Sequence, residues 1–193
     1  MRKRRLGWLC VALGALCLLS AALLALHNRS QAEAAVDAAQ RTLIQLAETI
    51  VGSRQEADPH SGIQVDGEQY LGFLSLPAIA VELPVRMEWD MEGLKTAPAR
   101  YAGSLEGGLV IGAHNYAAHF GGLSRLRQGD AVYLTDGAGA LHCYTVERIE
   151  TLAPESVAEM TDSGWELTLF TCTYGGQNRV TVRCRAAEEN RQG

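Results

Sequence analysis

Cys172 is the residue whose type and position in this sequence best suit covalent chemistry. It ends an apolar, β-branched stretch, and a six-residue loop containing Gly175-Gly176 separates it from a second such stretch that begins at Arg179. If the two stretches pair as a hairpin, Cys172 and Arg179 face each other across its open end. A guanidinium there favours the thiolate and can donate to an oxyanion beside it. The pattern therefore predicts a nucleophilic thiol, although a cysteine at a strand end is by itself more often a small buried residue.

A thiol nucleophile needs a proton partner, and histidine is the usual one. His114 directly follows the apolar stretch 109–113, so it is expected at the rim of a β structure. His119 comes five residues later in an expected loop, His142 lies in the middle of a strand pattern, and His60 falls in a polar linker. Position at a strand end favours His114 as the partner of the thiol.

Three arginines share one expected strand, and alternation places Arg179, Arg183 and Arg185 on the same face. Distance distinguishes them. At about 3.3 Å per residue, Arg183 lies roughly 13 Å and Arg185 roughly 20 Å further along the strand. Arg179 begins the strand beside the loop that leaves Cys172, so it is the arginine expected to reach a carbonyl bound at the thiol.

The other cysteines indicate packing rather than metal binding. Cys10 and Cys17 lie in an apolar N-terminal segment, whereas Cys143 and Cys184 lie inside strand patterns. Because three cysteines remain outside the N-terminal segment, at least one thiol is free even if the other two pair. No C-x-x-C spacing and no persuasive cluster of carboxylates occur, so we expect no metal.

Short apolar runs broken by glycine, proline and aspartate dominate the chain from about residue 70 onward. They predict strands over 70–76, 79–85, 109–113, 131–135, 141–152, 166–172 and 179–185. Short helical turns are expected near 91–96, 120–126 and 154–160. Several strands at this spacing, with no long helix between them, favour a mainly β fold, an antiparallel barrel or sandwich around one core.

The N-terminal segment has a different character. Four basic residues at positions 2–5 precede 21 uncharged residues, 6–26, that are rich in leucine and alanine. As a helix this segment is roughly 31 Å long, close to the hydrocarbon thickness of a bilayer. It predicts a single-pass transmembrane anchor over 6–27, with a cytoplasmic N-terminus and the rest of the chain outside the cell. A cleaved signal peptide is the alternative, and it also places the rest of the chain outside the cell.

Residues 28–68 are expected to form a helix followed by a linker. Apolar residues recur at steps of three and four over 31–51, at Val36, Ala39, Leu43, Leu46 and Ile50. The following stretch, 53–69, has the Asp-Pro, Ser-Gly and Asp-Gly pairs of an irregular linker.

The charge balance excludes one class of partner. The chain has 17 basic and 22 acidic residues, and four of the basic ones lie at positions 2–5. The remainder therefore carries a net charge of −9. Nucleic-acid-binding proteins present a basic face, so we expect no nucleic acid partner.

The stretch Thr168-Leu169-Phe170-Thr171-Cys172 resembles the T-L-x-T-C signature of sortases, enzymes that join surface proteins to the Gram-positive cell wall or join pilin subunits. The arginine at the start of the next strand and the histidine after an upstream apolar strand are similar to the family's pattern. The segments 72–79, 83–85, 114–116 and 119–123 also resemble it, and the resemblance covers about residues 69–186.

Two departures from the family pattern leave the class open. Ala113 stands where the family usually has glycine before its histidine. The short connection between Cys172 and Arg179 is similar to class B rather than class A, yet the helical insertion of class B is not evident.

The resemblance implies a sortase-like closed β-barrel of about eight strands with short helices. This barrel would occupy residues 69–188 and end in a tail over 189–193. Before it would come a cytoplasmic basic segment, 1–5, the transmembrane helix, 6–27, and an extracellular helix and linker, 28–68.

The resemblance also implies a transpeptidase mechanism. Cys172, as thiolate, attacks a carbonyl in a sorting signal of the L-P-x-T-G type, Arg179 holds the developing oxyanion, and His114 protonates the leaving amine. His114 then accepts a proton from the incoming amine that resolves the thioester. The implied partners are the sorting-signal peptide of a surface protein or pilin, and an amine of a cell-wall precursor or of a pilin lysine. No cofactor is implied.

Other functions remain as alternatives. An L,D-transpeptidase is also β-rich, but its motif has glycine before the cysteine and arginine two residues after it, where this chain has Thr171 and Tyr174. A chymotrypsin-like cysteine protease needs two barrels, and papain-like enzymes place the cysteine before the histidine. A non-catalytic binding module with a sortase-like barrel is the alternative of another class, and thiol labelling distinguishes it.

Overall fold

The structure is a computed structural model of the chain, and it describes residues 2–53, 62–162 and 164–187. The chain divides into two compact units, residues 1–34 and the part from residue 35 onward. The middle of the expected linker, 54–61, and the expected tail, 189–193, lie outside the described residues.

One helix, α1 (Arg2–Ser53), begins the described chain. It is longer than the expected helix over 31–51, because no proline and no glycine interrupts the chain between residues 15 and 51. In the second unit, Leu46 and Ile50 of α1 are buried and pack with Ile63, Val65 and Tyr70. The amphipathic pattern that the sequence predicts for this part of α1 is therefore confirmed.

The transmembrane anchor that the sequence predicts over 6–27 is not supported. Within the described residues, no helix combines the length and the apolar character that crossing a membrane requires. The prediction of a single-pass membrane localisation is therefore wrong.

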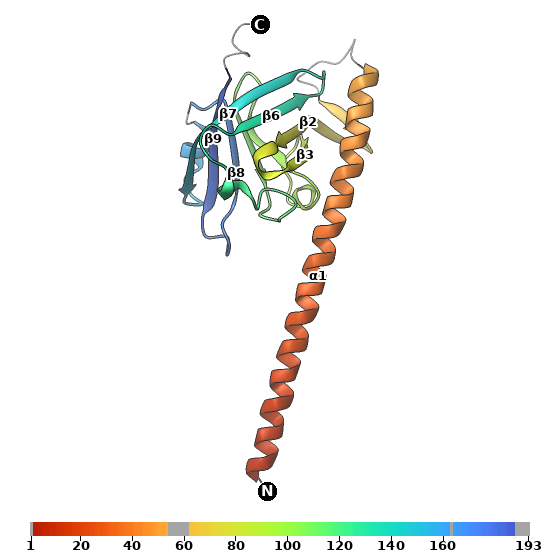
Figure 1. Cartoon of the computed structure of the whole chain (residues 1–193), viewed down its shortest axis with the longest axis vertical. Helices are drawn as coiled ribbons and strands as arrows, with labels where there is room; N and C mark the ends of the chain where they lie inside the picture. The colour runs from red at the N-terminus through yellow and green to blue at the C-terminus, as the bar shows by residue number, and fades with distance from the viewer. Residues whose placement is uncertain (1, 54–61, 163, 188–193) are drawn as a thin grey trace. The chain divides into compact units, whose positions relative to one another are not determined.

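Eight strands form a closed barrel (Figure 1). They are β2 (Glu68–Leu76), β3 (Val81–Arg86), β4 (Ala99–Ser104), β5 (Gly107–Ala113), β6 (Ala131–Asp136), β7 (Leu141–Leu152), β8 (Leu167–Cys172) and β9 (Arg179–Ala186). Around the barrel their order is β2-β3-β4-β5-β8-β9-β7-β6, and β6 pairs with β2 to close it. A short strand, β1 (Ile63–Val65), pairs with β2. The prediction of a mainly β, closed barrel is confirmed.

The helical elements of the barrel domain are short. They are η1 (Pro77–Ile79), η2 (Gly93–Lys95), η3 (Leu123–Arg125) and α2 (Val157–Thr161). Three of them lie where the sequence predicts helical turns. The fourth, η1, occupies the start of the strand expected over 79–85, because Pro77 begins a turn in which Ala80 has a positive φ of 53°.

Two strands, one of them in the barrel, were not predicted by the sequence analysis. β4 contains Gly103 and few large apolar residues, so it lacks the alternation of a strand. β1 does alternate, but at three residues it is too short to be recognised as a strand. The sequence also favoured an antiparallel sheet, whereas β3 pairs with β4 and β5 pairs with β8 in parallel. The second of these parallel pairs places the candidate site.

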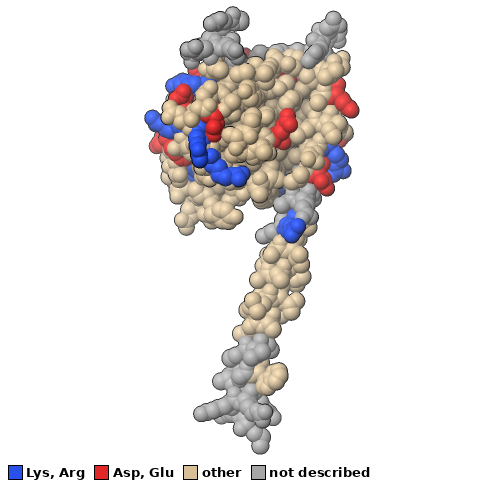
Figure 2. Space-filling view, viewed as in Figure 1, with Lys and Arg blue, Asp and Glu red and all other residues tan. Residues whose placement is uncertain are grey.

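Basic and acidic side chains lie interspersed on the face of the barrel domain in Figure 2. Several are paired, including Arg185 with Glu166 at 3.0 Å and Lys95 with Glu92 at 2.7 Å. Exposed ion pairs of this kind contribute little to stability. The barrel therefore depends mainly on its apolar interior, which contains Leu74, Leu109, Ile111, Leu134, Val146, Leu169 and Val182.

Candidate active site

The hairpin of β8 and β9 brings Cys172 and Arg179 opposite each other. They are the last paired residues of the two strands, next to the connecting loop 173–178. The loop is closed by the amide of Thr173, which donates to the carbonyl of Asn178 at 2.9 Å. The hairpin register that the sequence predicts is therefore confirmed, while the catalytic roles remain predictions.

The parallel pairing of β5 with β8 brings His114 to the same end of the barrel. Ala113 is the partner of Thr171, and the Thr171 hydroxyl donates to the Ala113 carbonyl at 2.8 Å. Because parallel strands run in the same direction, the residues that follow this pair, His114 and Cys172, emerge beside each other. The side-chain amide of Asn115 donates through Nδ2 to the carbonyl of Thr173 at 3.5 Å and links the two segments that follow β5 and β8.

The candidate residues belong to the outer face of the barrel wall. On β8, Leu167 and Leu169 point into the core, so alternation places Phe170 and Cys172 on the other face. Phe170 accordingly packs in a separate cluster outside the core. On β9, Val182 points into the core, and Arg179 therefore shares the outer face with Cys172.

The three arginines of β9 have different surroundings. Arg183 is 2% exposed; it pairs with Glu150 and donates to the carbonyls of Glu159 and Met160. Those carbonyls belong to α2, so Arg183 ties α2 to the barrel wall. Arg185 pairs with Glu166 and lies 4.3 Å from the ring centroid of Trp165, the geometry of a cation–π contact.

Arg179 differs from both, because among the described residues its hydrogen bonds go only to backbone carbonyls. Its Nη1 donates to the carbonyl of Gly176 at 3.0 Å and to that of Asn178 at 3.1 Å. No carboxylate of the described chain therefore neutralises this guanidinium, which stands across the hairpin from the thiol.

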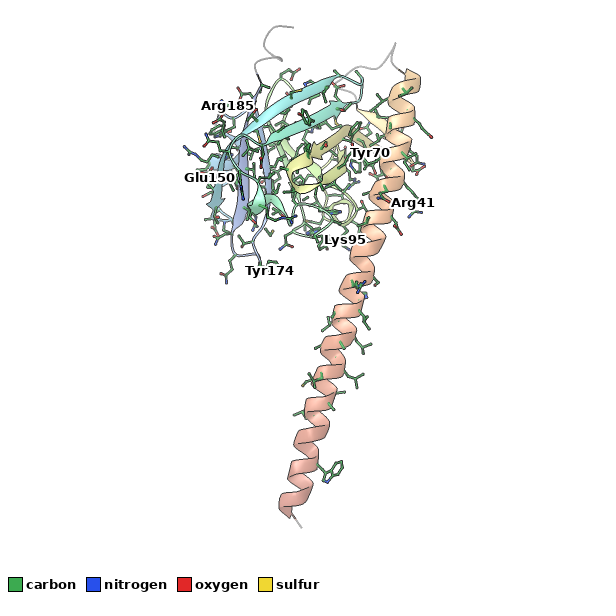
Figure 3. The ribbon with its side chains drawn as sticks, in the orientation of Figure 1. Arg41, Tyr70, Lys95, Glu150, Tyr174 and Arg185 are labelled. Atoms are coloured by element: carbon green, nitrogen blue, oxygen red, sulfur yellow. The ribbon has the colours of Figure 1, made fainter. Side chains whose placement is uncertain are left out.

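Figure 3 shows the end of the barrel at which the loop after Cys172 lies. Tyr174, two residues after Cys172, projects from the lower end in that view and is 99% exposed. Lys95 of η2 lies at the same end, whereas Arg185 lies towards the opposite end. The estimate from strand geometry that Arg185 is too distant to act at Cys172 agrees with this arrangement.

An apolar cavity of about 140 Å³ adjoins Arg179 on the outer face. Its wall is made by Trp89, Tyr101, Ala153, Pro154, Ser156, Val157, Met160 and Phe170. Trp89 stacks on Phe170 with ring centroids 5.8 Å apart, and Tyr101 meets both rings edge-on, at 4.9 and 5.4 Å. An aromatic-walled cavity beside Arg179 suits an apolar segment of a peptide.

Gly112 of β5 makes this aromatic wall possible. A Cβ atom at that position would lie 2.6 Å from the Phe170 ring and 2.7 Å from the Trp89 ring. The sequence analysis did not identify the wall. Alternation from Cys172 could have indicated Phe170, but Tyr101 lies on the undetected strand β4 and Trp89 in the connection before it.

His114 is half-buried, and its ring stacks on that of Tyr116 with centroids 4.9 Å apart. Burial, with a smaller contribution from the ammonium of Lys95, holds the pKa of His114 below its ordinary value of 6.5. The charge of Lys95 is partly offset by Glu92, at 2.7 Å. At neutral pH the imidazole is therefore mainly uncharged.

His119, the other histidine considered as a thiol partner, lies in the interior. Its side chain is 0% exposed, and neither ring nitrogen has a hydrogen-bond partner among the described residues, although the backbone of Thr96 lies near the ring. Burial, with the nearby charge of His114, lowers the pKa of His119 to about 4. A buried, uncharged histidine of this kind does not exchange protons with a substrate.

The buried His119 predicts a loss of stability in mild acid. Between pH 6.5 and about 4 the unfolded chain binds a proton on this histidine and the folded chain does not. The free energy of unfolding should therefore fall as the pH is lowered through this range, by about 3 kcal/mol from His119. Urea denaturation of the wild-type chain and of His119→Leu between pH 7.5 and 4.5 measures the difference.

The His119→Leu chain should lose less stability than the wild type over that range, since the other titrating groups are common to both. Parallel pH dependences of the two chains would mean that His119 is protonated in the folded state.

No group of three or more side chains able to hold a metal ion occurs within residues 2–53, 62–162 and 164–187. The residues at the site are a thiol, an imidazole and a guanidinium next to an apolar cavity. This set suits acyl transfer through a covalent thioester.

Comparison with known proteins identifies relatives of one kind. The model of the sortase domain matches residues 74–187. Sortase A of Bacillus anthracis is 27% identical over 115 residues, which are 56% of this chain and 54% of that protein, so the chain spans about half the length of this curated relative.

Two solved structures have a similar fold. Sortase A of Corynebacterium diphtheriae has a TM-score of 0.57 at 25% identity, over 63% of this chain and 62% of its own. Sortase C of Clostridium perfringens, solved with the C-terminal cell wall sorting motif, has a TM-score of 0.55 at 24% identity, over 79% and 89% of the two chains. At 24% identity, the similarity to this sortase C concerns the fold alone.

Proposed function

We propose that this chain, which belongs to the sortase family, is a cysteine transpeptidase that cleaves a sorting signal and transfers the acyl part to an amine. The observation that carries the proposal is the meeting of Cys172, His114 and Arg179 at one end of the barrel. A parallel strand pair and a hairpin bring them there from three separate elements. Membership of the family is also compatible with a catalytically inactive binding module, which is the remaining alternative.

In the first step the Cys172 thiolate attacks the carbonyl carbon of the scissile peptide bond, and the carbonyl oxygen becomes an oxyanion. Arg179 supplies the nearby N–H donors and positive charge for that oxyanion. His114, as imidazolium, gives its proton to the nitrogen of the leaving peptide. The C–N bond breaks, an amine departs, and the acyl group stays on Cys172 as a thioester.

In the second step an acceptor amine attacks the thioester carbonyl. His114, now neutral, takes a proton from the attacking nitrogen, a new C–N bond forms, and the C–S bond breaks. The thiolate and the imidazolium are thereby restored, so the cycle needs no cofactor. The site needs no third, acidic residue if Arg179 supplies the electrostatic stabilisation of the oxyanion.

The aromatic cavity suggests where the peptide lies. Because the wall of Trp89, Tyr101 and Phe170 adjoins Arg179, a peptide whose scissile carbonyl is at Cys172 would place an apolar upstream residue there. Leucine and proline of an L-P-x-T-G-like signal have that character. We propose such signals, in surface proteins or pilins, as the substrate class.

The ionisation state predicts slow turnover. Since burial holds the pKa of His114 low, most molecules at neutral pH carry a neutral imidazole. The reactive pair of thiolate and imidazolium is then a minor form, and kcat/KM depends on two macroscopic pKa values of the pair.

The experiment that tests the proposal uses the purified full-length chain with a library of sorting-signal peptides. One set of reactions contains a peptide with a free N-terminal amine as acceptor, another contains a lysine-bearing peptide, and a third contains neither. Mass spectrometry should detect a ligated product with at least one acceptor and cleavage without it. Peptide binding without cleavage, together with a Cys172 thiol that resists alkylation, would instead indicate a binding module.

A further inference from the structure

The segment after β5 is a compact turn built around Tyr116. The amides of His119 and Gly121 both donate to the Tyr116 carbonyl, each at 2.9 Å, and the amide of Phe120 donates to the His114 carbonyl at 3.2 Å. A Cβ atom at Gly121 would lie 2.7 Å from the carbonyl oxygens of Asn115 and Tyr116. The turn therefore has little freedom to change its shape.

Three rings of this turn are in series. The His114 and Tyr116 rings stack with centroids 4.9 Å apart and planes 27° apart. The Tyr116 and His119 rings have centroids 5.5 Å apart and planes 44° apart. His119 is 0% exposed, and the next residue, Phe120, is buried in the barrel core. Tyr116 thus lies between a ring fixed in the interior and the ring of the proposed proton carrier.

His114 lacks the usual means of orientation. In thiol–imidazole sites a third group commonly orients the imidazole through a hydrogen bond. Among the described residues, the ring of His114 has no such bond, and its recorded ring contact is the stack on Tyr116. The orientation of the ring must therefore come from packing.

We infer that Tyr116 is a positioning residue for His114. Its ring, backed by His119, holds the imidazole beside Cys172 and covers one face of it against water. This role rests on the proposed transpeptidase function, in which His114 must deliver a proton to one atom of the leaving peptide. The ring of Tyr116 performs the role, and its hydroxyl is not required.

Other groups near the imidazole act on its charge and not on its direction. Lys95 of η2 disfavours the imidazolium, and its ammonium is paired with Glu92. His119 adds no charge near neutral pH, because its pKa is about 4. Cys172 at the end of β8 and Arg179 at the start of β9 lie at the same end of the barrel.

The inference predicts different results for Tyr116→Phe and Tyr116→Leu. Tyr116→Phe keeps the stacked ring and should keep kcat near that of the wild type. Tyr116→Leu removes the stack, and kcat should fall by about tenfold to a hundredfold with little change in KM, because the proton carrier is no longer aligned. The acidic limb of the kcat/KM profile should move to higher pH, since a less covered imidazole is protonated more easily.

The measurement that does not need turnover is an NMR titration of the His114 ring. Its midpoint should rise towards the ordinary value of 6.5 in Tyr116→Leu and stay at the wild-type position in Tyr116→Phe. Tyr133→Leu on β6 is the matched control, because this half-buried tyrosine lies on a strand that pairs with β2 and β7, away from the site. It should leave both the midpoint and kcat unchanged.

If Tyr116→Leu lowers only the melting temperature, with the His114 midpoint and kcat of the wild type, the positioning role is refuted. If no chain turns over any peptide while the midpoint still shifts in Tyr116→Leu alone, the packing inference stands and the proposed function fails. The two failures are therefore distinguishable.

Discussion

Replacing Cys172 with alanine is expected to abolish turnover completely. Without the thiolate no thioester forms, and neither His114 nor Arg179 can supply a nucleophile in its place. The matched controls are Cys143→Ala and Cys184→Ala, which should retain most of the activity. Cys184 lies in the barrel core, where burial raises its thiol pKa to about 12, so it cannot serve as the thiolate.

The comparison is made as kcat/KM on one sorting peptide, together with the melting temperature of each chain. Cys184→Ala removes a core side chain and is expected to melt earlier while remaining active. Equal loss of activity in a folded Cys143→Ala or Cys184→Ala chain would contradict the assignment of the nucleophile.

Arg179→Lys is expected to lower kcat/KM by about a hundredfold. Lysine keeps the positive charge, but it lacks the planar fork that can hold an oxyanion and a peptide carbonyl together. The loss of one charged donor at an oxyanion is worth on the order of 3 kcal/mol, which corresponds to that factor. Arg185→Lys, on the same face near the other end of β9, is the matched control and should have nearly wild-type activity.

Arg183→Lys gives a third, distinguishable outcome. Arg183 is buried against Glu150 and holds the carbonyls of α2, so its loss should lower stability and loosen the cavity wall, raising KM more than it lowers kcat. Near-normal activity of Arg179→Lys combined with a crippled Arg185→Lys would mean that the guanidinium acting at the thiol has been misassigned.

The hairpin that carries the proposed nucleophile could be predicted from the sequence because the residues that define it are close together in the chain. The apolar run that ends at Cys172, the two glycines of the loop and the run that begins at Arg179 lie within twenty residues. The same locality places His114 at a strand end. What alternation could not indicate is that β5 and β8, far apart in the chain, pair in parallel and so bring His114 next to Cys172.

The parts that the sequence analysis missed depend on contacts between distant segments. Trp89 and Tyr101 form a wall only because Phe170 stacks against them and Gly112 leaves room. His119 also depends on such contacts. In the sequence it is a histidine of an expected loop, whereas in the structure its ring is buried behind Tyr116. The expected membrane anchor rested on the length and composition of 6–26 and on the basic residues before it, and the described helices do not support it.

The central claim is that an acyl group passes through a thioester on Cys172, and intact-mass spectrometry of the full-length chain tests it most directly. The chain is mixed with a library of sorting-signal peptides without an acceptor amine, quenched in acid, and mapped by peptide mass. We expect one acyl adduct on Cys172, absent from Cys172→Ala and released when an amine is added before the quench. Accumulation of cleaved peptide without an adduct, or an adduct on another residue, would contradict the account.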